Sequence, residues 1–184
     1  MNGNLIWMDL EMTGLDPENA VIVEIATLVT DAELHILAQG PNIAIAHPDH
    51  VLHQMDEWSR QHHEASGLLK RIYDSSMDTG AAESATLEFL SQYCADGACP
   101  LCGNSVWQDR RFLVKYMPRL NNFLHHRVID VSSFKEVVRR WYPAMPYYVK
   151  KGSHTALADV HESLNELRHY RAKVFLPPGP SDNQ

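Results

Sequence analysis

The chain has 184 residues, of which 45% are hydrophobic and 21% are charged, a balance typical of one globular domain with a sizeable core. The formal net charge of −7 argues against a protein that clamps a long nucleic acid, because such proteins carry basic stripes. A short anionic substrate is not excluded, since divalent cations would bring their own positive charge.

The first third of the chain predicts an antiparallel meander of three strands. Residues 4–11, 21–30 and 34–46 are rich in apolar and β-branched residues. The stretches "GLDPEN" and "TDAE" that separate them are typical of turns. These strands lie so close in sequence that short connections suffice to pair them.

Helices and short strands alternate in the remaining two thirds. Apolar residues at helical spacing predict helices over about 83–94, over 108–117 as far as Pro118, and over 155–173. Short strands are expected within "PLCGNSV" and "RVIDV", and a Ser133–Glu136 capping box indicates a further helix. Strands followed by alternating strands and helices imply an α/β fold, a mixed sheet covered by helices.

The sequence also predicts the domain organisation and the cellular location. We expect a single domain over residues 1–176 and a disordered tail over 177–184, where "PPGPSDNQ" is rich in proline. No apolar run approaches the roughly 18 residues of a membrane helix. No secretory pattern is visible in the first residues, so we expect a cytoplasmic protein.

Three cysteines lie close together in sequence, at Cys94, Cys99 and Cys102. The last two have the Cys-x-x-Cys spacing of a metal half-site or a redox pair. No further ligands and no thioredoxin-like order of elements surround them, and the cytosol is reducing. The sequence therefore favours buried free thiols over a functional pair.

Two carboxylates interrupt the first apolar strand. Side chains alternate faces along a strand, so Asp9 and Glu11 point to the same side of "LIWMDLEM". At about 4 Å and an effective dielectric constant near 20, their repulsion would be roughly 4 kcal/mol. Some interaction must offset this cost.

Two further acids are candidates to join them. Asp109 precedes Phe112 and Leu113 by three and four residues, which places it on the core-facing side of its predicted helix. Asp159 lies beside Val160, on the flank of the apolar stripe of the last predicted helix. A single acid in a first helical turn is usually structural, because the helix dipole favours it. Four inward or flank-facing acids instead suit Mg²⁺ or Mn²⁺, and two such ions can promote phosphoryl transfer.

A proton acceptor for the attacking water is also available. His154 lies in the loop "GSHTALADV", five residues before Asp159. A histidine on a loop can accept a proton near neutral pH. Most of the eleven histidines are expected to be surface residues, and His154 differs from them only through its separation from Asp159.

Five stretches together resemble the motifs of the oligoribonuclease family, which belongs to the DEDDh group of 3′-to-5′ exonucleases. They are "DLEMTGL", "ATLEFL", "CGNSVWQDRRFL", "IDVSSFKEVVRRW" and "SHTALADVHESL", and the match runs in order over residues 4–171. The resemblance implies a ribonuclease H-like fold, a homodimer, two divalent metal ions, and hydrolysis of very short RNA, dinucleotides above all, to 5′-mononucleotides. It implies that Asp9, Glu11 and Asp159 bind metal directly, that Asp109 holds the second metal partly through water, and that His154 is the general base.

The same resemblance implies a pocket for a short RNA. Leu15 resembles a wedge between two bases, and Trp58 and His63 resemble residues that hold the 3′ nucleotide. The polar groups that would cap the 5′ phosphate are Ser105, Arg127 and Ser132.

The residues themselves leave several of these roles open. Exposure of Leu15 could be chance or a stacking surface, and core packing is the default for Trp58 in its amphipathic helix. Nothing local selects between His62 and His63. One of Ser132 and Ser133 would cap a helix while the other could reach an anion.

Arg127 and its neighbours give one departure from the family. Arg127 forms a small positive patch with His125 and His126, which suits a terminal phosphate. His126 stands where the family commonly has a tyrosine that reaches across the dimer to stack on the substrate base, and imidazole offers less area for such stacking. The alternatives to an enzyme for short RNA are an exonuclease for longer RNA or DNA and an inactive nucleic-acid-binding module.

Overall fold

A single mixed sheet organises the computed structural model, which describes residues 3–149 and 155–176. Its five strands lie in the order β3-β2-β1-β4-β5. β1 pairs antiparallel with β2 and parallel with β4, while β2–β3 is antiparallel and β4–β5 is parallel. The strands are β1 (Leu5–Met12), β2 (Ile22–Thr30), β3 (Ile36–Ala44), β4 (Leu101–Gly103) and β5 (Val128–Asp130). The predicted meander and mixed sheet are confirmed.

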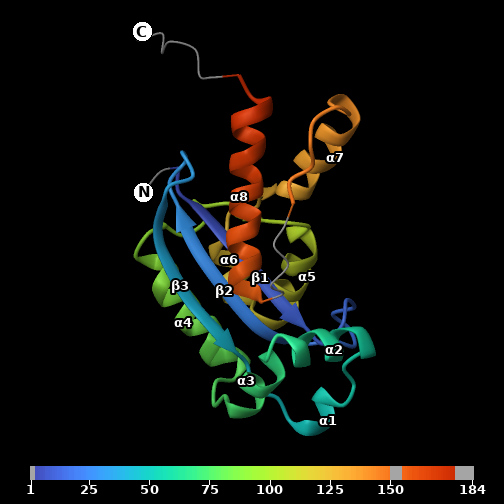
Figure 1. The fold of residues 1–184 in the computed structure, drawn as a ribbon. Helices are drawn as coiled ribbons and strands as arrows, with labels where there is room; N and C mark the ends of the chain where they lie inside the picture. Colours follow the sequence, from blue (N-terminus) through green and yellow to red (C-terminus); the bar gives the residue numbers. More distant parts are fainter. Residues whose placement is uncertain (1–2, 150–154, 177–184) are drawn as a thin grey trace.

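Helices cover both faces of this sheet. α8 crosses one face over β1 and β2, and α4 lies behind the sheet (Figure 1). A core cluster fills the space on each side. The helices are α1 (Asp49–Leu52), α2 (Glu57–Ala65), α3 (Leu68–Asp74), α4 (Thr79–Ser91), α5 (Val106–Tyr116), α6 (Pro118–Phe123), α7 (Val131–Trp141) and α8 (Ala156–Val174).

The pleat of β1 divides its side chains between the two cores. Ile6, Met8 and Leu10 belong to the cluster on the α4 side. Trp7 is fully buried on the α8 side, where its Nε1 donates to Thr30 Oγ1 at 3.0 Å. Asp9 and Glu11 have the parity of Trp7, so the pleat directs them toward the α8 side.

Several helix boundaries differ from the predictions; α4, for example, covers Thr79–Ser91 rather than about 83–94. The Ser133–Glu136 capping box is wrong, because α7 begins at Val131 and the side chain of Asp130 accepts from Ser132 N at 2.9 Å. Asp130, the last residue of β5, is the N-cap of α7, so Ser133 lies inside the helix. Pro118 ends α5 as expected, but it also opens α6, where its fixed φ suits the first turn.

The remaining fold-level expectations have mixed outcomes. All three cysteines are buried and free, as expected. Among the helices of residues 3–149 and 155–176, none is long and apolar enough to cross a membrane. The domain boundary at residue 176 stays a prediction, and residues 177–184 lie outside the described part of the chain.

Candidate active site

Three of the four candidate acids converge where α8 begins over the sheet. Asp9 and Glu11 on β1 and Asp159 in the first turn of α8 each offer a carboxylate oxygen, and these oxygens all lie within 4.8 Å of one another. The convergence arises because α8 packs directly on β1 and β2. Carboxylate oxygens are the ligands that hard divalent cations prefer, so the acid cluster could hold a metal ion.

The fourth acid approaches the same strand from another side. Asp109 in the first turn of α5 is only 6% exposed, and its Oδ1 accepts from Leu10 N at 3.0 Å. Burial raises its pKa to about 7, against the lowering effect of backbone hydrogen bonds from Leu10 and its own amide. Asp109 therefore reaches β1 between Asp9 and Glu11, but it does not belong to the 4.8 Å group.

Electrostatic strain is concentrated on Glu11. Burial, followed in order of size by the negative charges of Asp159, Glu24 and Asp109, raises the pKa of its carboxyl from 4.5 to about 8. Without a cation, this site lowers its charge by retaining a proton. A bound cation would relieve the same repulsion.

A cleft of about 240 Å³ opens beside the acid cluster. Leu15 and Trp58 stand at it with 72% and 64% of their surfaces exposed. The core-packing interpretation of Trp58 is therefore wrong, because its face on α2 turns to the cleft. The lining residues are Asp9, Leu10, Glu11, Met12, Gly14, Leu15, Trp58, Ser59, His62, His63 and Asp159.

The two neighbouring histidines differ in position. His63 is buried, its Nε2 lies 2.9 Å from Met12 O, and its Nδ1 lies 3.9 Å from the Glu11 carboxylate. Burial lowers the pKa of His63. The ring of His62 instead stacks on Trp58, with 3.8 Å between centroids. Both line the cleft, but only His63 is held against the acid-bearing strand.

Two of the residues expected at a 5′ phosphate, Ser105 and Ser132, form a separate polar cluster. The Oγ atoms of Ser105 and Ser132 lie 3.1 Å apart, and Asp130 Oδ1 accepts from the backbone N–H groups of both residues. Those two N–H groups are thus satisfied by a carboxylate, and Ser132 Oγ also donates to Asn104 Oδ1 at 3.1 Å, so the two serines belong to a connected polar network. Arg127 is exposed, and none of these residues is among the described ones that line the cleft. His154, the expected base, lies outside the described residues.

One functional candidate was missed in the sequence. Glu24 on β2 is fully buried and lies directly opposite Glu11 in the β1–β2 register. It forms an ion pair with Arg71 and accepts from Ala156 N at 3.1 Å. A charged residue inside "VIVEIATLV" is the same kind of signal that drew attention to Asp9, so the sequence did contain it.

The sheet order and the carboxylates on its central strand define an exonuclease-type nuclease domain. A family model described as Exonuclease (RNase_T) matches residues 6–167. The chain is also 55% identical to an oligoribonuclease of Dichelobacter nodosus over 95% of this chain and 97% of the relative. An oligoribonuclease of Marinobacter nauticus is 56% identical over 95% of this chain and 98% of the relative. The chain therefore belongs to the oligoribonuclease family of exonucleases, which confirms the predicted family and enzyme class.

Solved structures support the fold. A structure of exonuclease I superposes with a TM-score of 0.72 at 13% identity, covering 95% of this chain and 43% of that chain. The E. coli exonuclease I in complex with a dA16 oligonucleotide has the same TM-score and identity, over 94% of this chain and 41% of its own. The chain thus spans less than half the length of these proteins, and the likeness confirms the ribonuclease H-like fold class.

Proposed function

We propose that this chain hydrolyses very short oligoribonucleotides, dinucleotides especially, from the 3′ end and releases 5′-mononucleotides, using two divalent cations, Mg²⁺ or Mn²⁺. Membership of the oligoribonuclease family supports an exoribonuclease that acts on short substrates. The observation that carries the proposal is the acid cluster of Asp9, Glu11 and Asp159 at the edge of a cleft that exposes Leu15 and Trp58.

The acids have the chemistry that this reaction needs. Asp9, Glu11 and Asp159 would bind the cations directly, and Asp109 would act partly through water, because it lies outside the 4.8 Å group. Bound cations would withdraw charge from the scissile phosphate and stabilise the leaving 3′ oxygen. His154 would accept the proton of the attacking water.

The cleft supplies the contacts for bases and the 3′ nucleotide. Leu15 would insert between two bases. Its side chain is exposed at the cleft, so it could contact a base without leaving the core. Trp58 and His63, which line the same cleft, would hold the 3′ nucleotide. Aromatic surfaces and bases stack without regard to sequence, which suits an enzyme for mixed short RNAs.

The far end of the substrate would meet Ser105, Arg127 and Ser132. Two hydroxyls and a guanidinium suit a terminal 5′ phosphate. The backbone N–H groups of Ser105 and Ser132 donate to Asp130, and the two hydroxyl oxygens lie 3.1 Å apart. A phosphate fixed there would limit the length of strand that fits between this cluster and the acids.

The proposed enzyme is a cytoplasmic homodimer. β5 is an edge strand of the sheet, and its Val128 is 40% exposed. On α7, the next element, Trp141 is 72% exposed. An exposed edge and large exposed apolar side chains favour association with a second copy. His126, two residues before Val128, would lie close to the partner and could stack on a base there.

Digestion of 5′-labelled RNAs of two to seven nucleotides tests the function. We expect Mn²⁺-dependent release of mononucleotides, fastest for the shortest RNAs, and no release with a chelator or with the Asp9→Ala variant. Faster cleavage of longer strands would favour the processing exonuclease instead. Binding of RNA without any release would favour the inactive binding module.

A further inference from the structure

We propose that Glu24 is a positioning residue of the reaction: with Arg71, it fixes the first turn of α8 to the sheet and thereby sets where Asp159 meets Asp9 and Glu11. This inference rests on the proposed function, because it concerns how the acid cluster is assembled. Glu24 itself would contact neither substrate nor the reacting atoms.

The contacts of Glu24 connect three elements at one point. Glu24 lies on β2 and its side chain is fully buried. Its Oε2 accepts a hydrogen bond from the backbone N–H of Ala156, the first residue of α8, at 3.1 Å. Its Oε1 forms an ion pair with Nη1 of Arg71 on α3. Asp159 follows Ala156 by one helical turn, and Asp159 N donates to Thr155 O at 2.9 Å. The position of the Ala156 amide therefore sets the position of Asp159.

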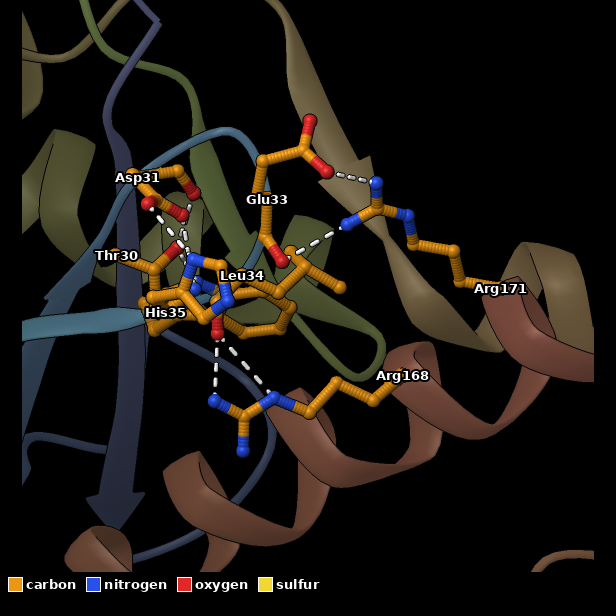
Figure 2. A network of polar contacts seen from close by, with 8 residues as sticks. Thr30, Asp31, Glu33, Leu34, His35, Arg168 and Arg171 are labelled. Atoms are coloured by element: carbon orange, nitrogen blue, oxygen red, sulfur yellow. Dashed lines mark hydrogen bonds and ion pairs between the residues drawn. The ribbon is translucent and has the colours of Figure 1, made fainter. Parts of the chain in front are cut away.

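The C-terminal half of α8 is held to the sheet by separate contacts. The Glu24 contact therefore acts on the first turn of α8, which carries Asp159. Figure 2 shows Arg168 and Arg171 of α8 reaching the β2–β3 turn. Arg168 donates to Leu34 O from Nε at 3.2 Å, and Arg171 donates to Glu33 O at 2.8 Å while pairing with its carboxylate. With the C-terminal half held there, loss of the Glu24 contact should loosen the first turn and leave the rest of α8 in place.

Glu24 occupies a position where a carboxylate needs a cationic partner. It stands opposite Glu11, and like charges directly across an antiparallel pair are destabilising. A fully buried carboxylate is also costly without a partner. Arg71, whose side chain is 40% exposed, supplies that partner and also donates to Asn42 O at 3.3 Å. The chain thus keeps a buried carboxylate and its arginine partner beside the acids.

A similar arrangement occurs on α4, outside the acid cluster, and provides a matched control. Glu83 on α4 is 5% exposed, its Oε1 accepts from Leu120 N at 3.0 Å near the start of α6, and its Oε2 pairs with Arg119 at 2.9 Å. Both glutamates thus bind a helix-terminal amide and an arginine. Only Glu24 does so on a helix that carries an acid of the cluster.

The test compares Glu24→Asp with Glu83→Asp in the full-length protein. Each change keeps the charge but shortens the side chain, so the carboxylate cannot reach both of its partners. Mn²⁺ binding is measured from the electron paramagnetic resonance signal of free Mn²⁺, and kcat and KM are measured on a labelled diribonucleotide. Thermal unfolding is followed in parallel.

We expect both variants to lose a few degrees of thermal stability, whereas only Glu24→Asp raises the Mn²⁺ dissociation constant, by about tenfold. Its kcat should fall by a similar factor with KM little changed, because the cleft residues are untouched. Equal Mn²⁺ binding and kcat in Glu24→Asp and Glu83→Asp would overturn the inference and leave only a structural role.

A second pair of variants decides the question if Glu24→Asp does not fold. Arg71→Met removes the ion pair at a partly exposed side chain, and Arg71→Lys restores a cation. We expect weaker Mn²⁺ binding in Arg71→Met and recovery in Arg71→Lys; unchanged binding in Arg71→Met would count against the inference. Absence of Mn²⁺-dependent hydrolysis in the unaltered protein would instead contradict the proposed function itself.

Discussion

Asp109 Oδ1 accepts a hydrogen bond from the backbone amide of Leu10 at 3.0 Å, so the buried acid of α5 is tied to the peptide between Asp9 and Glu11. The carboxylate of Asp109 thus has two roles. It satisfies an N–H group in the core and brings a negative charge next to the acid cluster. Substitution of Asp109 can separate the hydrogen bond from the charge.

We expect Asp109→Asn to retain the fold and lose at least about a hundredfold in turnover, because the amide oxygen still accepts from Leu10 while the charge is gone. Asp109→Ala should lose turnover equally and also lower the free energy of unfolding by about 1–3 kcal/mol, since Leu10 N is left without an acceptor. Urea denaturation and dinucleotide hydrolysis measure the two effects. Equal stability of the two variants would show that the hydrogen bond contributes nothing.

Removal of Asp9 should separate stability from activity. In a chelator, Asp9→Asn removes one member of a group of carboxylates within 4.8 Å of one another, so the free energy of unfolding should rise, by up to roughly 3 kcal/mol. Hydrolysis should disappear at the same time. Thermal unfolding with chelator and with Mn²⁺ checks this, because the variant should also lose the stabilisation by Mn²⁺. An active Asp9→Asn enzyme would remove Asp9 from the site.

The metal-free protein should become less stable as pH rises from 5 to 8. The folded pKa of Glu11 is raised from 4.5 to about 8 and that of Asp109 from 3.8 to about 7. The folded state therefore binds more protons than the unfolded state in this window, and the free energy of unfolding falls with pH by at most a few kcal/mol. Urea denaturation in chelator at both pH values measures the change. Glu11→Gln should flatten the dependence, and a rise with pH would contradict it.

Leu15 should affect substrate binding without affecting stability. It is 72% exposed, so Leu15→Ala should leave the unfolding temperature unchanged. Loss of about 1 kcal/mol of apolar contact with a base would raise KM about fivefold. Leu37→Ala is the control, because Leu37 is also exposed, at 46%, and does not line the cleft. An equal KM in both variants would exclude Leu15 from the substrate contact.

His154 should affect turnover without affecting metal binding. His154→Asn should lower kcat by about 10²–10⁴, the usual contribution of a general base. Mn²⁺ binding should stay as in the unaltered protein, in contrast to Asp9→Asn. Steady-state kinetics and Mn²⁺ titration measure the two. A variant that loses Mn²⁺ as well would place His154 among the ligands.

Local patterns in the sequence predicted much of this protein because they depend on neighbours along the chain. The two-residue period of β1 placed Asp9 and Glu11 on one face, and the helical period around Asp109 placed it toward the core, where it is 6% exposed. The meander and the order of the later elements follow from the same periodicities. Recognition of the family rested on motifs whose spacing the chain preserves.

Tertiary packing decided what no local pattern contains. Periodicity gives the face on which a side chain lies but not the partner that covers this face, so the 4.8 Å approach of Asp159 to Asp9 appears only once α8 lies across β1. The same limit explains the exposure of Trp58, because the helical period gives its face on α2 but not what lies against that face. The sequence by itself determined which acids could face inward. The distances between them depend on contacts between segments that lie far apart in the sequence.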